Sequence, residues 1–130
     1  MNNDIDWGSL TFGYIPTDYN VRSYFRNGQW GPIEVSDKPT VDVHIAATGL
    51  HYGQEIFEGM KAFRGKDGKI RIFRLEENAK RMIDSANGLL MAPIPVELFR
   101  EMVIKAVKLN ERFVPVSYTH LRAHETGRNL

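Results

Sequence analysis

The sequence lacks cysteine, which excludes disulfide bonds, thiolate metal sites and a cysteine nucleophile from its 130 residues. Histidine is scarce, and the four that occur show no HExxH or comparable metal-ligand spacing: His44, His51, His120 and His124. The GxGxxG and GxxxxGK runs that cradle nucleotide phosphates are also missing. We therefore expect neither a metal centre nor a phosphate loop of these types.

Long apolar runs and a strong charge imbalance are absent as well. No apolar segment approaches the ~20 residues that a membrane-spanning helix needs. The opening run MNNDIDWGSL has neither the basic nor the apolar region of a secretory signal. A formal net charge of +1 argues against a strong electrostatic attraction to nucleic acid. These features favour a cytoplasmic protein with no nucleic-acid or membrane partner.

Segments typical of strands come first in the chain and segments typical of helices come second. The pair Asn27-Gly28 predicts a hairpin between residues 20–26 and 29–35, and Pro32 weakens its second arm. Residues 41–45 alternate between apolar and polar side chains, which predicts another strand. Residues 10–14 fit either a short edge strand or an extended lead-in segment. This order predicts an α+β domain in which two amphipathic helices pack on an antiparallel sheet.

The stretch from residue 50 to residue 90 contains most of the informative signals. Residues 60–64 and 69–73 predict a second hairpin around the turn 65–68. Helical spacing then places six apolar residues on one face: Ala79, Met82, Ile83, Ala86, Leu89 and Leu90. After two prolines, residues 98–113 predict a second amphipathic helix that ends near Pro115.

Arg81 lies off the apolar stripe of the first predicted helix, on a face shared with Asn78 and Ser85. Small polar neighbours leave its guanidinium open to a phosphate or a carboxylate, which favours a binding site. The alternative is an ordinary surface pair with Glu77, four residues earlier. Local sequence alone leaves both interpretations open.

Tyr52 and Phe57 lie in an aromatic segment that has a glycine near each end, Gly53 and Gly59. Glycines at such positions allow tight bends or a close backbone approach. The two rings could therefore wall a flat ligand, or they could fill the core.

Several long runs together resemble the N-terminal domain of branched-chain amino acid aminotransferases: LTFGYIPTDYNVRSYFRNGQW, LHYGQEIFEGMKAFRG and KIRIFRLEENAKRM. The resemblance covers residues 10–115. It implies the smaller α+β domain of a fold-type IV enzyme that uses pyridoxal 5'-phosphate (PLP). It also implies transfer of an amino group between leucine, isoleucine or valine and 2-oxoglutarate, by a homodimer or larger assembly. Sister families, the D-amino acid transaminases and aminodeoxychorismate lyases, are similar mainly at FEG and the later arginine.

The resemblance assigns roles to three residues. Arg81 matches the arginine that binds the PLP phosphate, while Tyr52 and Phe57 match aromatic positions beside the substrate side chain. No lysine of this chain matches the catalytic lysine, which these enzymes carry in their C-terminal domain. We therefore expect residues 1–115 to be a non-catalytic part of such an enzyme.

Residues 116–130, VSYTHLRAHETGRNL, do not resemble the family's continuation and read as an unrelated or disordered tail, of artefactual origin. A chain that lacks its larger domain should expose an apolar patch and associate. The competing function is a non-catalytic α+β module that binds a ligand or a partner protein.

Overall fold

The computed structural model describes residues 15–115 as a small α+β fold of short strands and helices. The predicted segment 10–14 and the tail 116–130 lie outside these residues. Among the described residues, the strands are β1 (Asn20–Arg22), β2 (Phe25–Arg26), β3 (Gln29–Trp30), β4 (Glu34–Ser36), β5 (Ala62–Arg64) and β6 (Ile70–Ile72). The helices are α1 (Thr48–His51), α2 (Leu75–Gly88), α3 (Val96–Leu109) and the 3-10 turn η2 (Glu111–Phe113).

The first predicted hairpin forms, but as two short antiparallel ladders, β1 with β4 and β2 with β3. Asn27 and Gly28 both have positive φ, 54° and 81°, as a type I′ turn requires. Arg22 faces Glu34 and Phe25 faces Trp30, so residues 23–24 stand opposite residues 31–33. Between the two ladders the second arm therefore has one residue more than the first, which makes a β-bulge. Pro32, which has no N–H to donate, lies in this bulge.

The second hairpin, β5 with β6, is also confirmed. Its turn contains Gly68 at φ 83°. However, the prediction of one antiparallel sheet is wrong, because the described strands form three separate two-stranded ladders.

The strand predicted at residues 41–45 is also wrong. This segment has no strand structure, and Val41, Val43 and Ile45 are 54%, 51% and 78% exposed. Alternation marks a segment that suits a strand, but a strand also needs a partner edge, and none of the described strands pairs with this one.

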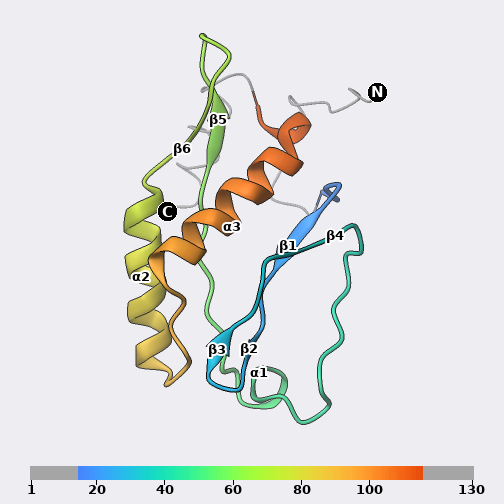
Figure 1. Cartoon of the computed structure of the whole chain (residues 1–130), viewed down its shortest axis with the longest axis vertical. Coiled ribbons are helices and arrows are strands. Elements are labelled where there is room, and N and C mark those ends of the chain that lie inside the picture. Colours follow the sequence, from blue (N-terminus) through green and yellow to red (C-terminus); the bar gives the residue numbers. More distant parts are fainter. Residues whose placement is uncertain (1–14, 116–130) are drawn as a thin grey trace.

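Helices α2 and α3 pack against each other, and α3 also packs on β1 (Figure 1). The buried residues at this junction are small or aromatic: Ala79 and Ala86 of α2 and Phe99 of α3. The helical prediction extended too far at one end, because α2 stops at Gly88 and Leu90 is 90% exposed. Phe113, which was predicted to lie in the second helix, belongs to η2 instead.

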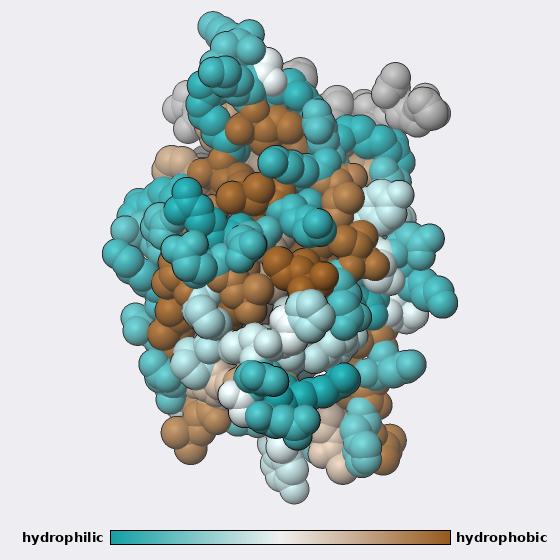
Figure 2. Space-filling view, viewed as in Figure 1, coloured by the Kyte–Doolittle hydropathy of each residue, from teal (hydrophilic) through white to brown (hydrophobic). Residues whose placement is uncertain are grey.

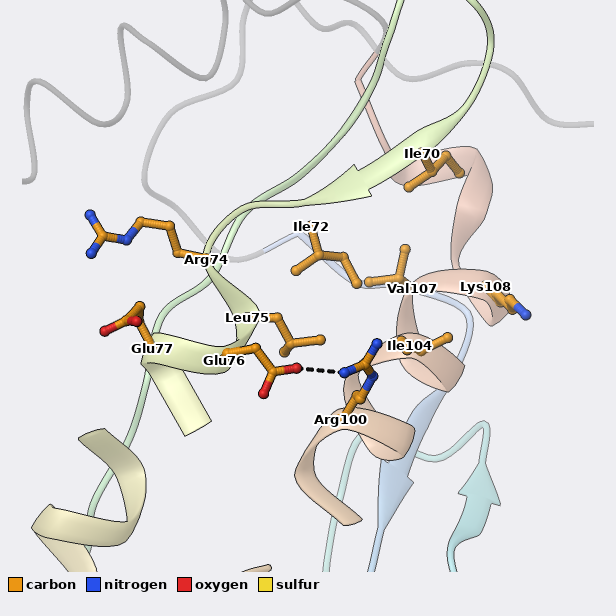
Figure 3. Close-up of a pocket in the computed structure, with 10 residues that line it drawn as sticks. All are labelled: Ile70, Ile72, Arg74, Leu75, Glu76, Glu77, Arg100, Ile104, Val107 and Lys108. Atoms are coloured by element: carbon orange, nitrogen blue, oxygen red, sulfur yellow. Dashed lines mark hydrogen bonds and ion pairs between the residues drawn. The ribbon is translucent and has the colours of Figure 1, made fainter. Parts of the chain in front are cut away.

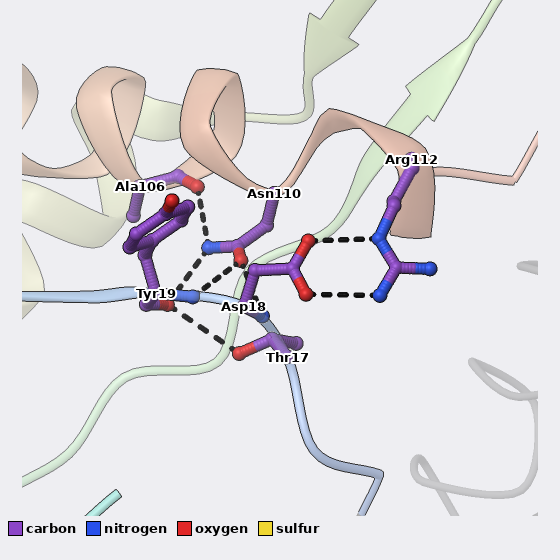
Figure 4. A network of polar contacts seen from close by, with 6 residues as sticks. All are labelled: Thr17, Asp18, Tyr19, Ala106, Asn110 and Arg112. Carbon is purple, nitrogen blue, oxygen red and sulfur yellow. Dashed lines mark hydrogen bonds and ion pairs between the residues drawn. The ribbon is translucent and has the colours of Figure 1, made fainter. Parts of the chain in front are cut away.

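A polar network fastens the chain before β1 to the end of α3 (Figure 4). The Asn110 side-chain oxygen accepts the backbone N–H groups of Asp18 and Tyr19, at 3.0 and 2.9 Å. Its amide nitrogen donates to the carbonyls of Tyr19 and Ala106, both at 2.9 Å. Beside it, the Arg112 guanidinium binds the Asp18 carboxylate through two bonds.

Within the part of the chain that the structure describes, no helix is long and apolar enough to cross a bilayer.

Candidate functional site

Arg81 is bound by an acid that is distant in sequence. Its Nε lies 3.1 and 2.8 Å from the two carboxylate oxygens of Glu58, and its Nη2 lies 2.7 Å from Oε1. The pairing with Glu77, one of the two possibilities open from the sequence, is therefore wrong. The hydrogen bonds from Arg81 lower the pKa of Glu58, and the carboxylate in turn raises the pKa of Arg81.

The two partners differ sharply in burial. The Glu58 side chain is only 6% exposed, whereas the Arg81 side chain is 67% exposed. Asn78 is buried beside them, and its amide donates to Glu58 at 2.7 Å and to the Gly59 carbonyl at 3.0 Å. Asn78 thus lines the same hollow as Arg81, as the shared helical face predicted, but its side chain is not open to solvent. It is buried in the network that holds Glu58.

Glu58 is buried because of the conformation of the segment before β5. Burial alternates along residues 55–60, with Ile56, Glu58 and Met60 more buried than Glu55, Phe57 and Gly59. Such alternation is the period of an extended chain. It turns Glu58 inward to α2 and leaves Phe57 outward.

An open hollow of about 750 Å³ lies between residues 59–61 and residues 73–84, which include most of α2. The ionised side chains that line it are mainly cationic: Lys61, Arg74, Lys80 and Arg81, against Glu77 and Asp84. With Glu58, which is paired with Arg81 just behind the lining, counted as a third negative charge, the hollow keeps a small positive excess, which favours an anionic ligand. Arg81 donates to Glu58 through Nε and Nη2 only, so within residues 15–115 Nη1 keeps its donors for such a ligand. The donor set therefore fits a phosphate group.

Tyr52 and Phe57 do not line this hollow, and each is 83% exposed. The core-filling interpretation of the two rings is therefore wrong. Tyr52 follows α1 directly, and Gly53 makes the bend after it at φ 67°. The structure does not bring these aromatic residues together with Arg81, and it leaves both rings available for a contact outside the described residues.

A second hollow of about 660 Å³ lies between β6, the start of α2 and the face of α3. Figure 3 shows Ile72, Leu75 and Val107 pointing toward its centre. At its edge, Arg100 and Glu76 form an ion pair at 2.6 Å. This pair joins the first turn of α2 to α3.

Sequence reasoning missed Glu58 and Lys61 as parts of the site. A signal for Glu58 was available, because a carboxylate lies at an inward position among apolar residues and needs a cationic partner there. Among the described residues, no cluster of three or more histidine, aspartate or glutamate side chains could hold a metal ion.

Known proteins resemble the chain over most of its described length. A branched-chain-amino-acid aminotransferase of Haemophilus influenzae is 44% identical over 108 residues, which is 83% of this chain and 32% of the relative. This chain is homologous to part of the branched-chain aminotransferases. The corresponding enzyme of Helicobacter pylori is 37% identical over 111 residues, 85% of this chain and 33% of the relative. A chloroplastic branched-chain-amino-acid aminotransferase of Arabidopsis thaliana is 41% identical over 113 residues, 86% of this chain and 27% of the relative.

The chain thus spans about a third of the length of the curated relatives it matches. No protein-family profile matches it.

Proposed function

We propose that this chain is a piece of a PLP-dependent, fold-type IV aminotransferase that moves the amino group between leucine, isoleucine or valine and 2-oxoglutarate. The observation that carries the proposal is the open guanidinium of Arg81 in a cationic hollow, within a chain similar to part of a branched-chain-amino-acid aminotransferase. PLP, when bound, supplies the electron sink for the transfer.

Arg81 holds the cofactor phosphate in this proposal. A guanidinium recognises a phosphate through paired, charge-assisted hydrogen bonds, and the neighbouring lysines of the hollow add positive potential. Lys61 and Lys80 line the same hollow, but we assign neither to covalent catalysis. The catalytic lysine, in this proposal, lies beyond residues 1–115 in a larger second domain.

Tyr52 and Phe57 serve as part of the apolar wall around the substrate side chain. Both rings are far more exposed than large aromatic side chains usually are, and a pocket completed by further chain would cover them. Apolar contact separates substrates that differ by one methylene by only ~1–3 kcal/mol, so such a wall accepts all three branched-chain amino acids.

The test uses the full-length protein, read from the coding DNA beyond the codon for Pro115. It should transaminate leucine, isoleucine and valine with 2-oxoglutarate. Arg81→Ala should weaken PLP binding by about 10- to 100-fold, because a charge-assisted phosphate contact is lost. Unchanged PLP affinity would remove Arg81 from the cofactor site, and activity restricted to D-amino acids or aminodeoxychorismate would assign a sister family.

A second measurement uses the 130-residue chain alone. Reduction with borohydride in the presence of PLP should give no stoichiometric adduct on a single lysine. Such an adduct would contradict the placement of the catalytic lysine outside this chain. Saturable PLP binding without an adduct would favour a non-catalytic binding module.

A further inference from the structure

Glu58 is a buried carboxylate whose role the proposed function leaves open. Removing a carboxylate from water is costly unless hydrogen bonds replace the lost hydration. Here three bonds from Arg81 and one from Asn78 do so. Among the described residues, every hydrogen-bond partner of the Glu58 side chain lies on α2, which begins seventeen residues later in the sequence.

The pairing occupies one edge of the Arg81 guanidinium. Nε and Nη2 both point at Glu58, which fixes the plane and the rotation of the group. Among the described residues, Nη1 has no protein partner, and Nη2 has one further N–H. An anion in the hollow therefore meets the end of the guanidinium, its Nη1–Nη2 edge, and not the Nε side.

The charge of Glu58 alone works against such an anion. A carboxylate next to the arginine lowers the positive potential that attracts a phosphate. Any net benefit to binding must then come from orientation. A long arginine side chain that is held in one rotamer loses less conformational freedom when the ligand binds.

We propose that Glu58 is a positioning residue that holds Arg81 so that its Nη1–Nη2 edge receives the phosphate of PLP end-on. This inference rests on the proposed function, in which Arg81 binds that phosphate. A purely structural role for Glu58, as a link between residues 58–59 and α2, is the alternative to be separated from it.

The experiment measures the dissociation constant of PLP from the full-length apoenzyme by titration at equilibrium. Glu58→Gln keeps the size of the side chain but replaces the charge-assisted pair, and it should weaken PLP binding about tenfold. Arg81→Ala should weaken it at least as much. The double variant should bind no more weakly than Arg81→Ala, since Glu58 acts only through Arg81.

Glu76→Gln is the matched control. It also replaces a glutamate by glutamine, but at a position of α2 that does not line the cationic hollow. The change disturbs the exposed ion pair between Glu76 and Arg100, which lies at 2.6 Å. Its PLP affinity should equal that of the wild type. A second readout is the phosphorus NMR signal of bound PLP, which should shift in Glu58→Gln and stay in place in Glu76→Gln.

The outcomes separate the two proposals. If Arg81→Ala binds PLP weakly while Glu58→Gln binds it as tightly as the wild type, or more tightly, Glu58 has no positioning role and the proposed function stands. Additive losses in the double variant also overturn the positioning role. Normal binding by Arg81→Ala contradicts the proposed function itself. Should Glu58→Gln unfold below the assay temperature, Glu58→Asp, which keeps the charge but shortens the reach, is judged by the same criteria.

Discussion

At the scale of single residues, the Asn110 side chain makes more long-range hydrogen bonds than any other uncharged side chain among the described residues. It satisfies two backbone N–H groups before β1, and it donates to one carbonyl there and to one in the last turn of α3. Asn110→Ala removes all four bonds and should lower the free energy of unfolding by about 2 kcal/mol, since each such bond contributes about 0.5–1.5 kcal/mol and water replaces part of the loss. Urea denaturation of the chain measures this.

The control for this prediction is Asn87→Ala, which makes the same change at an exposed position of α2. It should change the unfolding free energy by less than about 0.5 kcal/mol. Equal changes of the unfolding free energy in the two variants would show that the Asn110 hydrogen bonds do not stabilise the contact between the chain before β1 and the end of α3.

Residue positions were predictable from the sequence where the signal was local. The position of Arg81 on a polar part of its helix follows from the 3.6-residue period, and the structure places it at a cationic hollow. Its partner could not be found in this way, because Glu58 lies 23 residues upstream and only the fold brings it to α2. Spacing along one helix favoured Glu77 because i, i+4 reasoning considers only the helix itself. The cofactor and substrate roles of Arg81, Tyr52 and Phe57 stay predictions.

At the scale of elements, the end of α2 carries a strained residue. Leu90 has φ 57°, its N–H reaches the carbonyl of Asn87 at 3.3 Å, and the N–H of Met91 reaches that of Ala86 at 2.8 Å. This is the Schellman pattern, which favours glycine at the left-handed position. Because Leu90 is 90% exposed, Leu90→Gly loses little buried area. It should raise the free energy of unfolding by about 0.5–1 kcal/mol, measured by urea denaturation.

The neighbouring residue supplies the comparison. Leu89 has φ −105° and is 42% exposed, so Leu89→Gly gains no relief of strain and loses partial burial. This variant should be less stable than the wild type. A loss of stability in Leu90→Gly similar to that in Leu89→Gly would mean that the side chain of Leu90 contributes more than its conformation costs.

The helices and hairpins were predictable because each has a signal inside its own sequence. The Asn-Gly and Asp-Gly turns mark both hairpins, and the apolar period marks α2 and α3. Element ends were less predictable, since two adjacent leucines extend the apolar pattern past Gly88, where α2 ends, to Leu90, where the backbone turns. The strand at residues 41–45 failed for a different reason, because pairing depends on a neighbour that the segment does not encode.

At the scale of the whole molecule, the described fold has a small core for its size. Four hydrophobic residues are buried to 9% exposure or less: Ala79, Ala86, Phe99 and Val114. Thirteen large hydrophobic side chains of residues 15–115 are exposed. Figure 2 shows brown hydrophobic surface interleaved with teal polar groups across the face that carries α2 and α3. The α+β class was predictable from the order of segments, whereas the separation into three ladders was not, because it depends on which edges meet. The proposed function accounts for such exposure, since it makes the chain part of a longer protein whose further residues would cover this surface.

This exposure predicts that the 130-residue chain associates with itself. Its net charge of +1 provides little mutual repulsion, and exposed apolar surface favours contact between copies. Sedimentation at increasing concentration should therefore give a weight-average mass that rises above that of the monomer. Replacing two of the most exposed aromatic residues, in the double variant Tyr52→Ser and Phe57→Ser, should reduce the association without lowering stability, because each ring is 83% exposed. The charge-balanced pair Lys66→Ser and Glu101→Ser, also at exposed positions, should leave the association unchanged. A wild-type chain that stays monomeric at every concentration would contradict the idea that these side chains form an uncovered contact surface.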